Sequence, residues 1–376
     1  MEQIPLNIRL LHLSTARTWR GGEQQIAYLA EELSRVKGLT QIIVCARYSA
    51  MHLYCREKGL PHRAFTKAFS FNLFFAYQLK RVCRQHQIDL IHLHDPHAHQ
   101  FGVLASDVFG NSTPMLLSRR VDYPVKSSSY SQYKYNHPQI KRIICVSEAV
   151  RQVMSKTITD PTKLVRVYSG IDLGKFSNIA TTGLLRKTFH IASDEKIIGN
   201  TGALTEQKDY PTFLDTARRL LDEGVKAKFV IIGQGHLLKQ LTRYASKLDL
   251  LPHVIFTGFR SDVASLLTEF DLFMSTSAAE GLGTSIADAM ACGIPVVATD
   301  AGGVGEMVLH EQTGLLVPVG DSLSLSKAVQ RLLQNPALAK QLSQHALLHI
   351  QQFSKANTAQ ITLGIYRTVL KEANQA

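Results

Sequence analysis

The sequence predicts an α/β fold made of two doubly wound parallel-sheet domains. Short apolar and β-branched runs alternate with longer helical patterns, as expected for parallel strands joined by crossover helices. The chain has 376 residues, of which 45% are hydrophobic, and this length exceeds what one hydrophobic core usually organises. The polar stretch IDLGKFSNIATTG at 171–183 divides the runs into two series. We therefore expect Rossmann-like domains at 1–178 and 184–354, with a C-terminal helix at about 355–376 that packs back on the first.

Each series contains six expected strands, whose continuous apolar character is typical of strands buried on both faces of a parallel sheet. In the first half they are NIRLLHLS (7–14), QIIVCA (41–46), IDLIHLH (88–94), PMLLS (114–118), RIICVS (142–147) and KLVRVYS (163–169). In the second half they are KIIGNTGAL (196–204), AKFVIIG (227–233), HVIFTG (253–258), DLFMST (271–276), IPVVAT (294–299) and TGLLVPV (313–319). Helical patterns at 211–223, 236–249 and 321–334 separate strands of the second series.

The cysteines and the first residues favour a cytoplasmic protein. The five cysteines are odd in number and lack CxxC spacing, which is typical of buried thiols in a reducing compartment. The opening stretch MEQIPLNIRLLHLST has no basic region before an apolar core, and the sequence contains no run of about 18 apolar residues. We therefore expect no membrane-spanning helix.

The net charge of +12 comes entirely from the first half of the chain. Residues 1–178 carry 24 Lys and Arg against 12 Asp and Glu, whereas residues 179–376 carry 18 of each. Positive charge confined to one domain favours an anionic partner for that domain, such as a membrane face, a phosphorylated lipid or nucleic acid. A basic surface that serves only solubility is the alternative.

The segment KAFSFNLFFAYQLKRVCRQH at 67–86 combines aromatic and basic residues. The aromatic ones are Phe69, Phe71, Phe74, Phe75 and Tyr77, and the basic ones are Lys67, Lys80, Arg81 and Arg84. Such a mixture is typical of a helix that lies in the interface of an anionic membrane. A crossover helix whose aromatic side chains pack on the sheet is the alternative interpretation.

The stretch IHLHDPHAH at 91–99 raises the question of a metal site, because it contains His92, His94, Asp95, His97 and His99. The expected strand ends near His94, and Asp95 turns the chain toward a helix. His97 and His99 are two apart on that helix and point in different directions, so they cannot both join His92 as ligands. We therefore expect no metal site. Because ligands bind at the carboxyl ends of parallel strands, His94 and Asp95 are expected to face a ligand; an ordinary strand-end cap is the alternative.

The most specific signal lies at residues 273–321. Glu280 follows an expected strand, GLGTS at 281–285 forms a turn, and a helix over 284–292 directs its positive N-terminus toward that turn. Asp288 follows Thr284 by four residues, which places both on the same side of the helix. The turn's backbone N–H groups and the helix terminus are suited to hydroxyl or phosphate oxygens.

This region resembles the donor site of the retaining glycosyltransferases of family 4, whose signature is a Glu, seven residues and a second Glu. Other segments are similar to the family in order and spacing, so that the resemblance covers nearly the full chain. They are RGGEQQIAYLAEEL (20–33), CVSEAV (145–150), VYSGIDLGKF (167–176), TGALTEQKD (201–209), IIGQG (231–235), FTGF (256–259), ATDAGGVGEMV (298–308) and TGLLVPVGD (313–321). The resemblance implies a GT-B fold, in which two Rossmann-like domains face each other across a cleft.

The resemblance also implies roles for individual residues. Glu280 would bond the donor sugar, Lys208 would neutralise the diphosphate, and Asp288 would hold the ribose hydroxyls. The implied donor-binding residues are Gly21, Gly22, Gly202, Lys208, Gly233, Gly258, Phe259, Glu280, Leu282, Gly283, Thr284, Ser285 and Asp288. Turn geometry alone is the alternative explanation for the glycines.

The sequence departs from the family pattern in three ways. Asp288 replaces the second Glu, which withdraws its carboxylate by roughly one C–C bond, about 1.5 Å. Ala203 stands where the family usually has an arginine, so one cation near the diphosphate is lost. Arg119 and Arg120 stand where the family usually has a histidine, and one of them is a candidate to replace that cation. An arginine pair bonded to Asp122 or to carbonyls is the alternative.

The sequence therefore predicts a retaining glycosyltransferase. The implied catalytic residues are Glu280, Lys208, Arg119 and His94, and the implied acceptor-positioning residues are His94, Asp95 and Arg120. We expect a nucleotide-sugar donor, a sugar or lipid-linked acceptor, an anionic membrane surface at the inner face of the cytoplasmic membrane, no nucleic acid, and no metal or other cofactor. Assembly of a bacterial surface glycan is the expected process. A degenerate nucleotide-sugar-binding protein, or an epimerase of the same fold, is the alternative.

Overall fold

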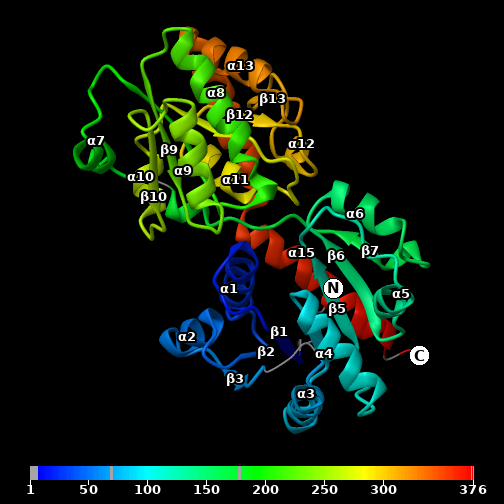
Figure 1. The fold of residues 1–376 in the computed structure, drawn as a ribbon. Coiled ribbons are helices and arrows are strands. Elements are labelled where there is room, and N and C mark those ends of the chain that lie inside the picture. Colours follow the sequence, from blue (N-terminus) through cyan, green and yellow to red (C-terminus); the bar gives the residue numbers. More distant parts are fainter. Residues whose placement is uncertain (1–6, 68–70, 177–178, 374, 376) are drawn as a thin grey trace. The chain divides into compact units, whose positions relative to one another are not determined.

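The structure is a computed structural model that describes residues 7–67, 71–176, 179–373 and 375. The chain forms two compact units (Figure 1): unit 1 comprises residues 1–170 and 355–376, and unit 2 comprises residues 171–354. The C-terminal helix belongs to unit 1, whereas the stretch expected as a linker belongs to unit 2. Residues 177 and 178 of that stretch lie outside the described residues, as does Phe69 of the aromatic segment.

Unit 1 contains a sheet of seven strands in the order β3-β2-β1-β4-β5-β6-β7, with every neighbouring pair parallel. The strands are β1 Ile8–Ser14, β2 Leu39–Ala46, β3 His62–Phe65, β4 Leu90–Leu93, β5 Met115–Arg119, β6 Ile140–Cys145 and β7 Leu164–Arg166. Six of them match the expected runs. The sequence pattern does not predict β3, because its four residues HRAF form no apolar run at this edge of the sheet.

The helices of unit 1 are α1 Gly21–Leu33, α2 Ala50–Glu57, α3 Leu73–Gln85, α4 Pro96–Asp107, α5 Ser129–Asn136, α6 Glu148–Ser155 and α15 Lys355–Ala373. Helix α15, red in Figure 1, packs with α1 on the sheet although it ends the chain. Leu33 of α1, Leu10 of β1 and Tyr366 of α15 share one buried cluster. The apolar face of α15 thus helps to form the core of unit 1.

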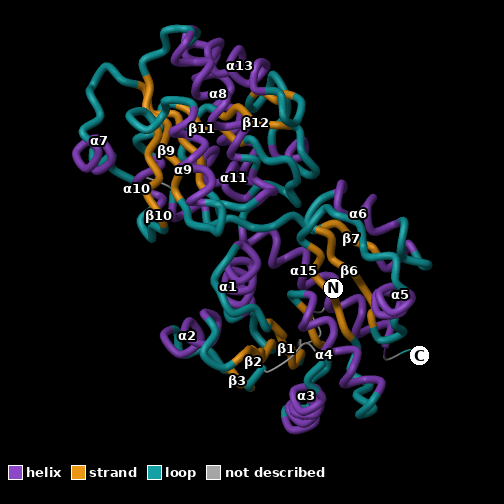
Figure 2. Tube along the Cα trace, viewed as in Figure 1, coloured by secondary structure: helices purple, strands orange, loops and turns teal. Residues whose placement is uncertain are grey.

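Unit 2 contains six parallel strands in the order β10-β9-β8-β11-β12-β13. The strands are β8 Lys196–Thr201, β9 Ala227–Ile232, β10 Val254–Gly258, β11 Leu272–Ser275, β12 Val296–Thr299 and β13 Leu315–Val317. The helices are α7 Leu184–Phe189, α8 Tyr210–Asp222, α9 Leu238–Lys247, α10 Val263–Leu267, α11 Thr284–Ala291, α12 Val304–Met307, α13 Ser322–Gln334 and α14 Pro336–His349. Figure 2 shows the strands of each sheet flanked by helices.

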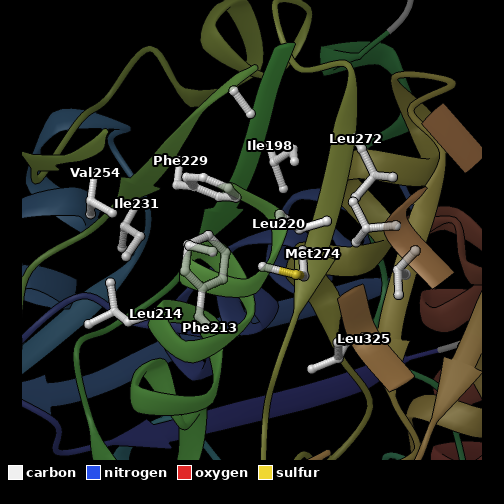
Figure 3. Packing of buried hydrophobic residues seen from close by; sticks show 14 of the residues in the cluster. Ile198, Phe213, Leu214, Leu220, Phe229, Ile231, Val254, Leu272, Met274 and Leu325 are labelled. Atoms are coloured by element: carbon white, nitrogen blue, oxygen red, sulfur yellow. The ribbon is translucent and has the colours of Figure 1, made fainter. Parts of the chain in front are cut away.

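Both sheets have a switch point, where the strand order reverses and where open α/β sheets bind ligands. It lies between β1 and β4 in unit 1 and between β8 and β11 in unit 2. The core beneath the second one is well packed (Figure 3): Phe213 of α8 meets Phe229 of β9 edge to face, with ring centroids 6.3 Å apart. In the described part of the chain, no helix is both long enough and apolar enough to cross a membrane.

Candidate functional site

The loops that follow β8, β9 and β10 contact one another through their backbones. Gly202 N donates to the Ile232 carbonyl at 3.0 Å, and Gly233 N donates to the Gly258 carbonyl at 3.0 Å. Gly233 has a φ of 153°, and a Cβ atom on it would lie 1.8 Å from the Gly202 carbonyl oxygen. Only glycine permits this approach without movement of the backbone. Three of the sequence-predicted glycines therefore lie together at one edge of the unit 2 sheet.

Lys208 and Glu280 meet at the switch point of this sheet. Lys208 ends the short 3-10 helix η3 Glu206–Lys208 after β8, and Glu280 follows β11. Their side chains form an ion pair and remain 20% and 19% exposed. The Gln207 carbonyl also accepts a hydrogen bond from Ala278 N at 2.8 Å, which ties the two loops together. The structure thus brings together the residues that the sequence assigned to the diphosphate and the sugar.

Helix α11 begins beside Glu280. Its N-cap, Gly283, has a φ of 94°, and among the described residues no side chain caps this terminus. The Glu280 carbonyl accepts a hydrogen bond from Gly303 N at 2.9 Å, which holds the turn. Leu282 is buried, whereas Thr284 and Ser285 are half-buried in the first turn. The first-turn N–H groups of α11 and its dipole are suited to an anionic oxygen.

Asp288 lies one turn further along α11. Burial raises the pKa of its carboxyl to about 7, against which the positive charge of Lys175 acts to lower it. Lys175 ends the 3-10 helix η2 Leu173–Lys175 of the same unit. A carboxyl with a pKa near 7 changes its charge at physiological pH. Because only the ionised form is purely an acceptor, its bonding to hydroxyl groups should depend on pH.

Phe259 follows β10 directly and is 67% exposed. The preceding Gly258 has a φ of 72°, and a Cβ atom on it would meet nothing within 4 Å. The left-handed backbone conformation therefore explains why this residue is glycine, whereas a lack of space for a side chain does not. The exposed ring stands at the glycine-lined edge, where an aromatic ring of a ligand would find a stacking partner.

In unit 1, Arg120, His94 and His12 form a chain of hydrogen bonds. Arg120 Nη2 donates to His94 Nδ1 at 3.1 Å, since a guanidinium has no acceptor. A neutral His94 then carries its proton on Nε2 and donates it to His12 Nδ1 at 2.9 Å. Burial lowers the pKa of His12 to about 4 and that of His94 well below its usual value, so both rings are neutral at neutral pH.

His12, His92 and His94 together have six ring nitrogens, and one nitrogen from each residue lies within 4.8 Å of one nitrogen of each of the other two. Hydrogen bonds engage five of these six nitrogens, and the sixth, His12 Nε2, is buried without a partner among the described residues. A metal ion would have to displace those bonds beside the positive Arg120, so the geometry favours hydrogen-bonded histidines. His99 is separate, because its Nε2 donates to the Lys134 carbonyl at 2.9 Å.

Asp95 joins the end of β1 to helix α4. Its Oδ1 accepts from His97 N at 2.9 Å, Ala98 N at 2.8 Å and Thr15 Oγ1 at 2.9 Å, while Oδ2 accepts from Thr15 N at 2.5 Å. The bonds from His97 and Ala98 cap the N-terminus of α4, and the two bonds from Thr15 tie Asp95 to the end of β1. This arrangement agrees with the strand-end cap that the sequence left open as the alternative. A role in acceptor positioning stays a prediction.

The two arginines after β5 have different surroundings. Arg119 is 6% exposed, and its guanidinium donates to the Tyr135 hydroxyl at 3.1 Å and the Tyr123 carbonyl at 2.6 Å. Arg120 is half-buried and donates to the His94 carbonyl at 2.8 Å. Burial lowers the pKa of Arg120 to about 10, so the guanidinium remains charged. Arg120 is therefore the better placed of the two to meet a ligand.

The first turn of α1 contains the other predicted donor residues, Gly21 and Gly22. Helix α1 begins at Gly21, and a Cβ atom on Gly22 would meet nothing within 4 Å, so this backbone is open. Glu23 is 5% exposed and accepts from Arg20 N at 3.0 Å. Burial raises the pKa of Glu23, which the charge of Arg120 counteracts.

Two family models match consecutive parts of the chain. Residues 19–175 match "Glycosyltransferase Family 4", and residues 183–348 match "Glycosyl transferases group 1". The chain belongs to the family 4, group 1 glycosyltransferases. Its two parallel-sheet units agree with the GT-B fold of this family.

Named relatives and solved structures agree with this membership. N-acetyl-alpha-D-glucosaminyl L-malate synthase from Bacillus anthracis is 25% identical over 80% of this chain and 80% of its own. The UDP-Gal:alpha-D-GlcNAc-diphosphoundecaprenol alpha-1,3-galactosyltransferase of Escherichia coli is 23% identical over 69% of this chain and 70% of its own. The structure of Anabaena Alr3699/HepE in complex with UDP-glucose has a TM-score of 0.84 at 21% identity, covering 96% of this chain and 100% of that one.

The sequence did not identify every residue around the unit 1 switch point of this glycosyltransferase. His92 Nδ1 bonds the Tyr366 hydroxyl at 2.6 Å, and His92 Nε2 bonds Ser118 Oγ at 2.8 Å. His12 is the neighbour of His92 in the β1–β4 register. The similar runs LLHLS and LIHLH were a usable signal for His12, because adjacent parallel strands align such histidines. Tyr366 is 274 residues from His92 and gives no such signal.

Gly233→Ala should destabilise unit 2 of the glycosyltransferase by at least about 3 kcal/mol, because the new Cβ collides with the backbone of Gly202. Gly320→Ala is the matched control: Gly320 has a φ of 76°, but its Cβ would meet nothing within 4 Å. It should cost only about 1 kcal/mol of left-handed strain. Urea unfolding measures both values, and equal losses would contradict the contact.

Proposed function

We propose that this glycosyltransferase is a retaining enzyme that transfers a sugar from a uridine diphosphate sugar to a lipid-linked or phosphorylated acceptor in bacterial surface glycan assembly. The observation that carries the proposal is the Lys208–Glu280 ion pair at the unit 2 switch point, beside the N-terminus of α11. A cation next to a carboxylate suits a ligand with an anionic diphosphate next to a hydroxyl-rich sugar.

Each group at this edge has a proposed task. Phosphate oxygens replace Glu280 as the partner of Lys208, and Glu280 then accepts hydrogen bonds from the sugar hydroxyls. As the bond between the anomeric carbon and the phosphate oxygen breaks, its electron pair moves to the departing diphosphate. Lys208 and the N–H groups of residues 282–285 stabilise this developing charge. Asp288 accepts from the ribose hydroxyls, and Phe259 stacks on the base.

The proposed reaction needs no protein nucleophile and no cofactor. The acceptor hydroxyl attacks the anomeric carbon on the face that the diphosphate leaves, so the configuration is retained. The departing phosphate oxygen takes the acceptor's proton, which balances the step. Lys208 and the α11 terminus supply the positive charge that a metal ion provides in other transferases, so we propose that no metal ion is required.

Unit 1 is proposed to position the acceptor. Arg120 is charged and half-buried, and two hydrogen bonds to His94 at 2.8 and 3.1 Å fix its guanidinium. Both ring nitrogens of His94 are engaged in hydrogen bonds. We therefore propose that Arg120 contacts the anionic group of the acceptor and that His94 orients Arg120. Gly22 offers an open backbone at the start of α1, and with Gly21 it is proposed to contact phosphate oxygens of the donor.

The relatives support the choice of donor and acceptor. The E. coli relative is named for a UDP-galactose donor and a diphosphoundecaprenol acceptor, and the Anabaena structure contains UDP-glucose. An acceptor with a membrane-embedded lipid would also suit the basic first half of the chain, because anionic membranes attract basic surfaces.

Lys208→Gln should weaken the binding of the UDP-sugar donor about 10- to 100-fold, since a hydrogen bond to a charged group contributes about 1.5–3 kcal/mol. Calorimetry with a panel of UDP- and GDP-sugars first identifies the donor. Lys340→Gln, at an exposed lysine of α14, is the matched control and should leave the affinity unchanged. Equal affinities of the two variants would contradict the assignment of Lys208.

In a turnover assay with the donor identified by calorimetry, Glu280→Gln should lower turnover about 100-fold, on the scale of losing one polar contact to the transition state. The affinity for free UDP should stay within about twofold, because Glu280 is assigned to the sugar. Nuclear magnetic resonance of the product should show the donor's anomeric configuration. An inverted product would contradict retention, and donor binding without turnover on any acceptor would indicate a binding protein.

Affinity for the nucleotide sugar should rise between pH 6 and pH 8, because the Asp288 pKa is about 7 and the carboxylate is the better acceptor. Both phosphates of a nucleotide sugar are esterified and do not titrate in this range. Asp288→Asn should remove the rise. A raised pKa in the folded state also means that this group stabilises the fold at low pH and that this contribution is lost as the pH rises through 7. An unchanged pH profile in Asp288→Asn would contradict the assignment.

We further propose that helix α3 holds the enzyme against an anionic membrane surface. Phe74 and Tyr77 are 64% and 44% exposed. Arg81 and Arg84 continue the same exposed stripe at helical spacing. Phe75 is fully buried, where its ring packs on that of Phe101 with centroids 4.4 Å apart. The helix therefore packs on unit 1 with one face and offers aromatic and basic side chains with the other.

Sedimentation with vesicles that contain phosphatidylglycerol should recover the protein at low salt, and raising the salt should release it. The double variant Phe74→Ser, Tyr77→Ser should bind less, since it removes the apolar contacts. Leu348→Ser is the control, because Leu348 is an apolar residue of unit 2 that is 75% exposed. Binding that is equal in the two variants would rule out α3 as the contact surface.

A further inference from the structure

A cluster of basic side chains lies at the β3 edge of the unit 1 sheet. The sequence assigned none of these residues to the donor or the acceptor. A pocket of about 380 Å³ opens there between α2 and the strands β2 and β3. The side chains that line it include Arg47, Arg56, Arg63, His52, His62 and Tyr48. Five of these six are cationic or become so on protonation, and none of the described residues that line the pocket is acidic.

The three arginines have no carboxylate partner. Arg47, Arg56 and Arg63 are exposed, and none of them forms an ion pair within the described ranges of the chain. Other arginines of unit 1 are paired, for example Arg9 with Asp89 at 2.7 Å and Arg151 with Glu148 at 2.7 Å. Three guanidinium groups around one concavity repel one another unless an anion lies between them.

The two histidines are held in defined orientations. Tyr48 N donates to His52 Nδ1 at 3.0 Å, so a neutral His52 carries its proton on Nε2. His62 Nδ1 donates to the Leu60 carbonyl at 2.8 Å, so its Nε2 gains a proton only when the ring becomes cationic. The rings lie 5.4 Å apart, centroid to centroid. Burial lowers the pKa of His52 most, and the nearby charges of His62, Arg56 and Arg47 lower it further. A bound anion would oppose the effect of those charges.

The backbone at this pocket is strained. Tyr48 has a φ of 61°, a left-handed conformation that costs a non-glycine residue about 1 kcal/mol or more. Its side chain is 80% exposed. This conformation directs the Tyr48 N–H to His52, and Ser49 then caps α2 by accepting from His52 N at 3.1 Å. The strained residue thus orders the imidazole that lines the pocket.

We propose that Arg47, Arg56 and Arg63, with His52 and His62, form a binding pocket for a phosphate or diphosphate group. Guanidinium groups bind phosphate oxygens through paired hydrogen bonds, and three of them match a dianion or trianion. The ligand's remaining part extends outward, because the lining arginines are exposed. The group belongs either to a lipid headgroup in a bilayer or to a soluble phosphate compound, and the chemistry of recognition is the same.

The test uses the full chain and inorganic pyrophosphate as the probe. Calorimetry should show that the protein binds pyrophosphate. The affinity should fall at least about tenfold in a triple variant that combines Arg47→Gln, Arg56→Gln and Arg63→Gln. Arg243→Gln, at an exposed arginine of α9, should leave the affinity unchanged. All titrations are made in a Lys208→Gln background, so that the proposed donor site does not contribute and a failure here stays distinct from a failure of the proposed function.

Two further arms identify the source of the phosphate and the part of the histidines. If the triple arginine variant no longer binds vesicles that contain phosphatidic acid, the pocket is assigned to a lipid headgroup. If the variant loses only its binding of pyrophosphate, the pocket is assigned to a soluble compound. Sulfate keeps its charge between pH 6 and pH 8, so it should bind more tightly at pH 6 and lose this preference in His52→Gln, His62→Gln. If the triple variant, folded by circular dichroism, binds pyrophosphate and vesicles as the parent does, the proposal is overturned.

Discussion

Close backbone contact between the loops after β8 and β9 is the constraint on which the unit 2 site depends. A Cβ atom would lie 1.8 Å from the Gly202 carbonyl oxygen if placed on Gly233, and 2.2 Å from the Leu204 carbonyl oxygen if placed on Gly235. Any larger side chain would push the loop after β8 away from β9. That loop continues into η3, which carries Lys208, so its displacement would separate Lys208 from Glu280.

The two units use the same topological position for different chemistry. In unit 2 the strands at the switch point lead to Lys208 and Glu280, an ion pair that remains partly exposed to solvent. In unit 1 they carry His12 and lead to His94, which are both buried and neutral. The charged Arg120 donates a hydrogen bond to His94, and His94 donates in turn to His12. A neutral chain can orient a charge without adding a second one in the interior, where an unpaired charge is costly.

The sequence predicted what local patterns specify and missed what depends on tertiary contact. Of the thirteen strands in the described residues, the apolar runs located twelve, and glycines with acidic residues located the unit 2 edge, but HRAF of β3 has no apolar pattern. Arg119 and Arg120 are equivalent by residue type. Successive side chains of a strand point to opposite faces, so the structure was needed to show Arg119 inside and Arg120 half-buried. Likewise, 72 residues separate Lys208 from Glu280, and no local pattern joins them.

The ion pair also affects which ligand the site prefers in the proposed reaction. Lys208 is partnered by Glu280 in the structure, so its charge is compensated before any ligand arrives. A diphosphate that takes Lys208 leaves Glu280 without that ion pair, and the carboxylate, to which Ser277 Oγ also donates at 3.4 Å, can then accept further hydrogen bonds. The hydroxyls of an attached sugar supply them. Free nucleotide diphosphate would satisfy Lys208 alone, whereas a nucleotide sugar satisfies both residues, and this difference favours the substrate over the spent product.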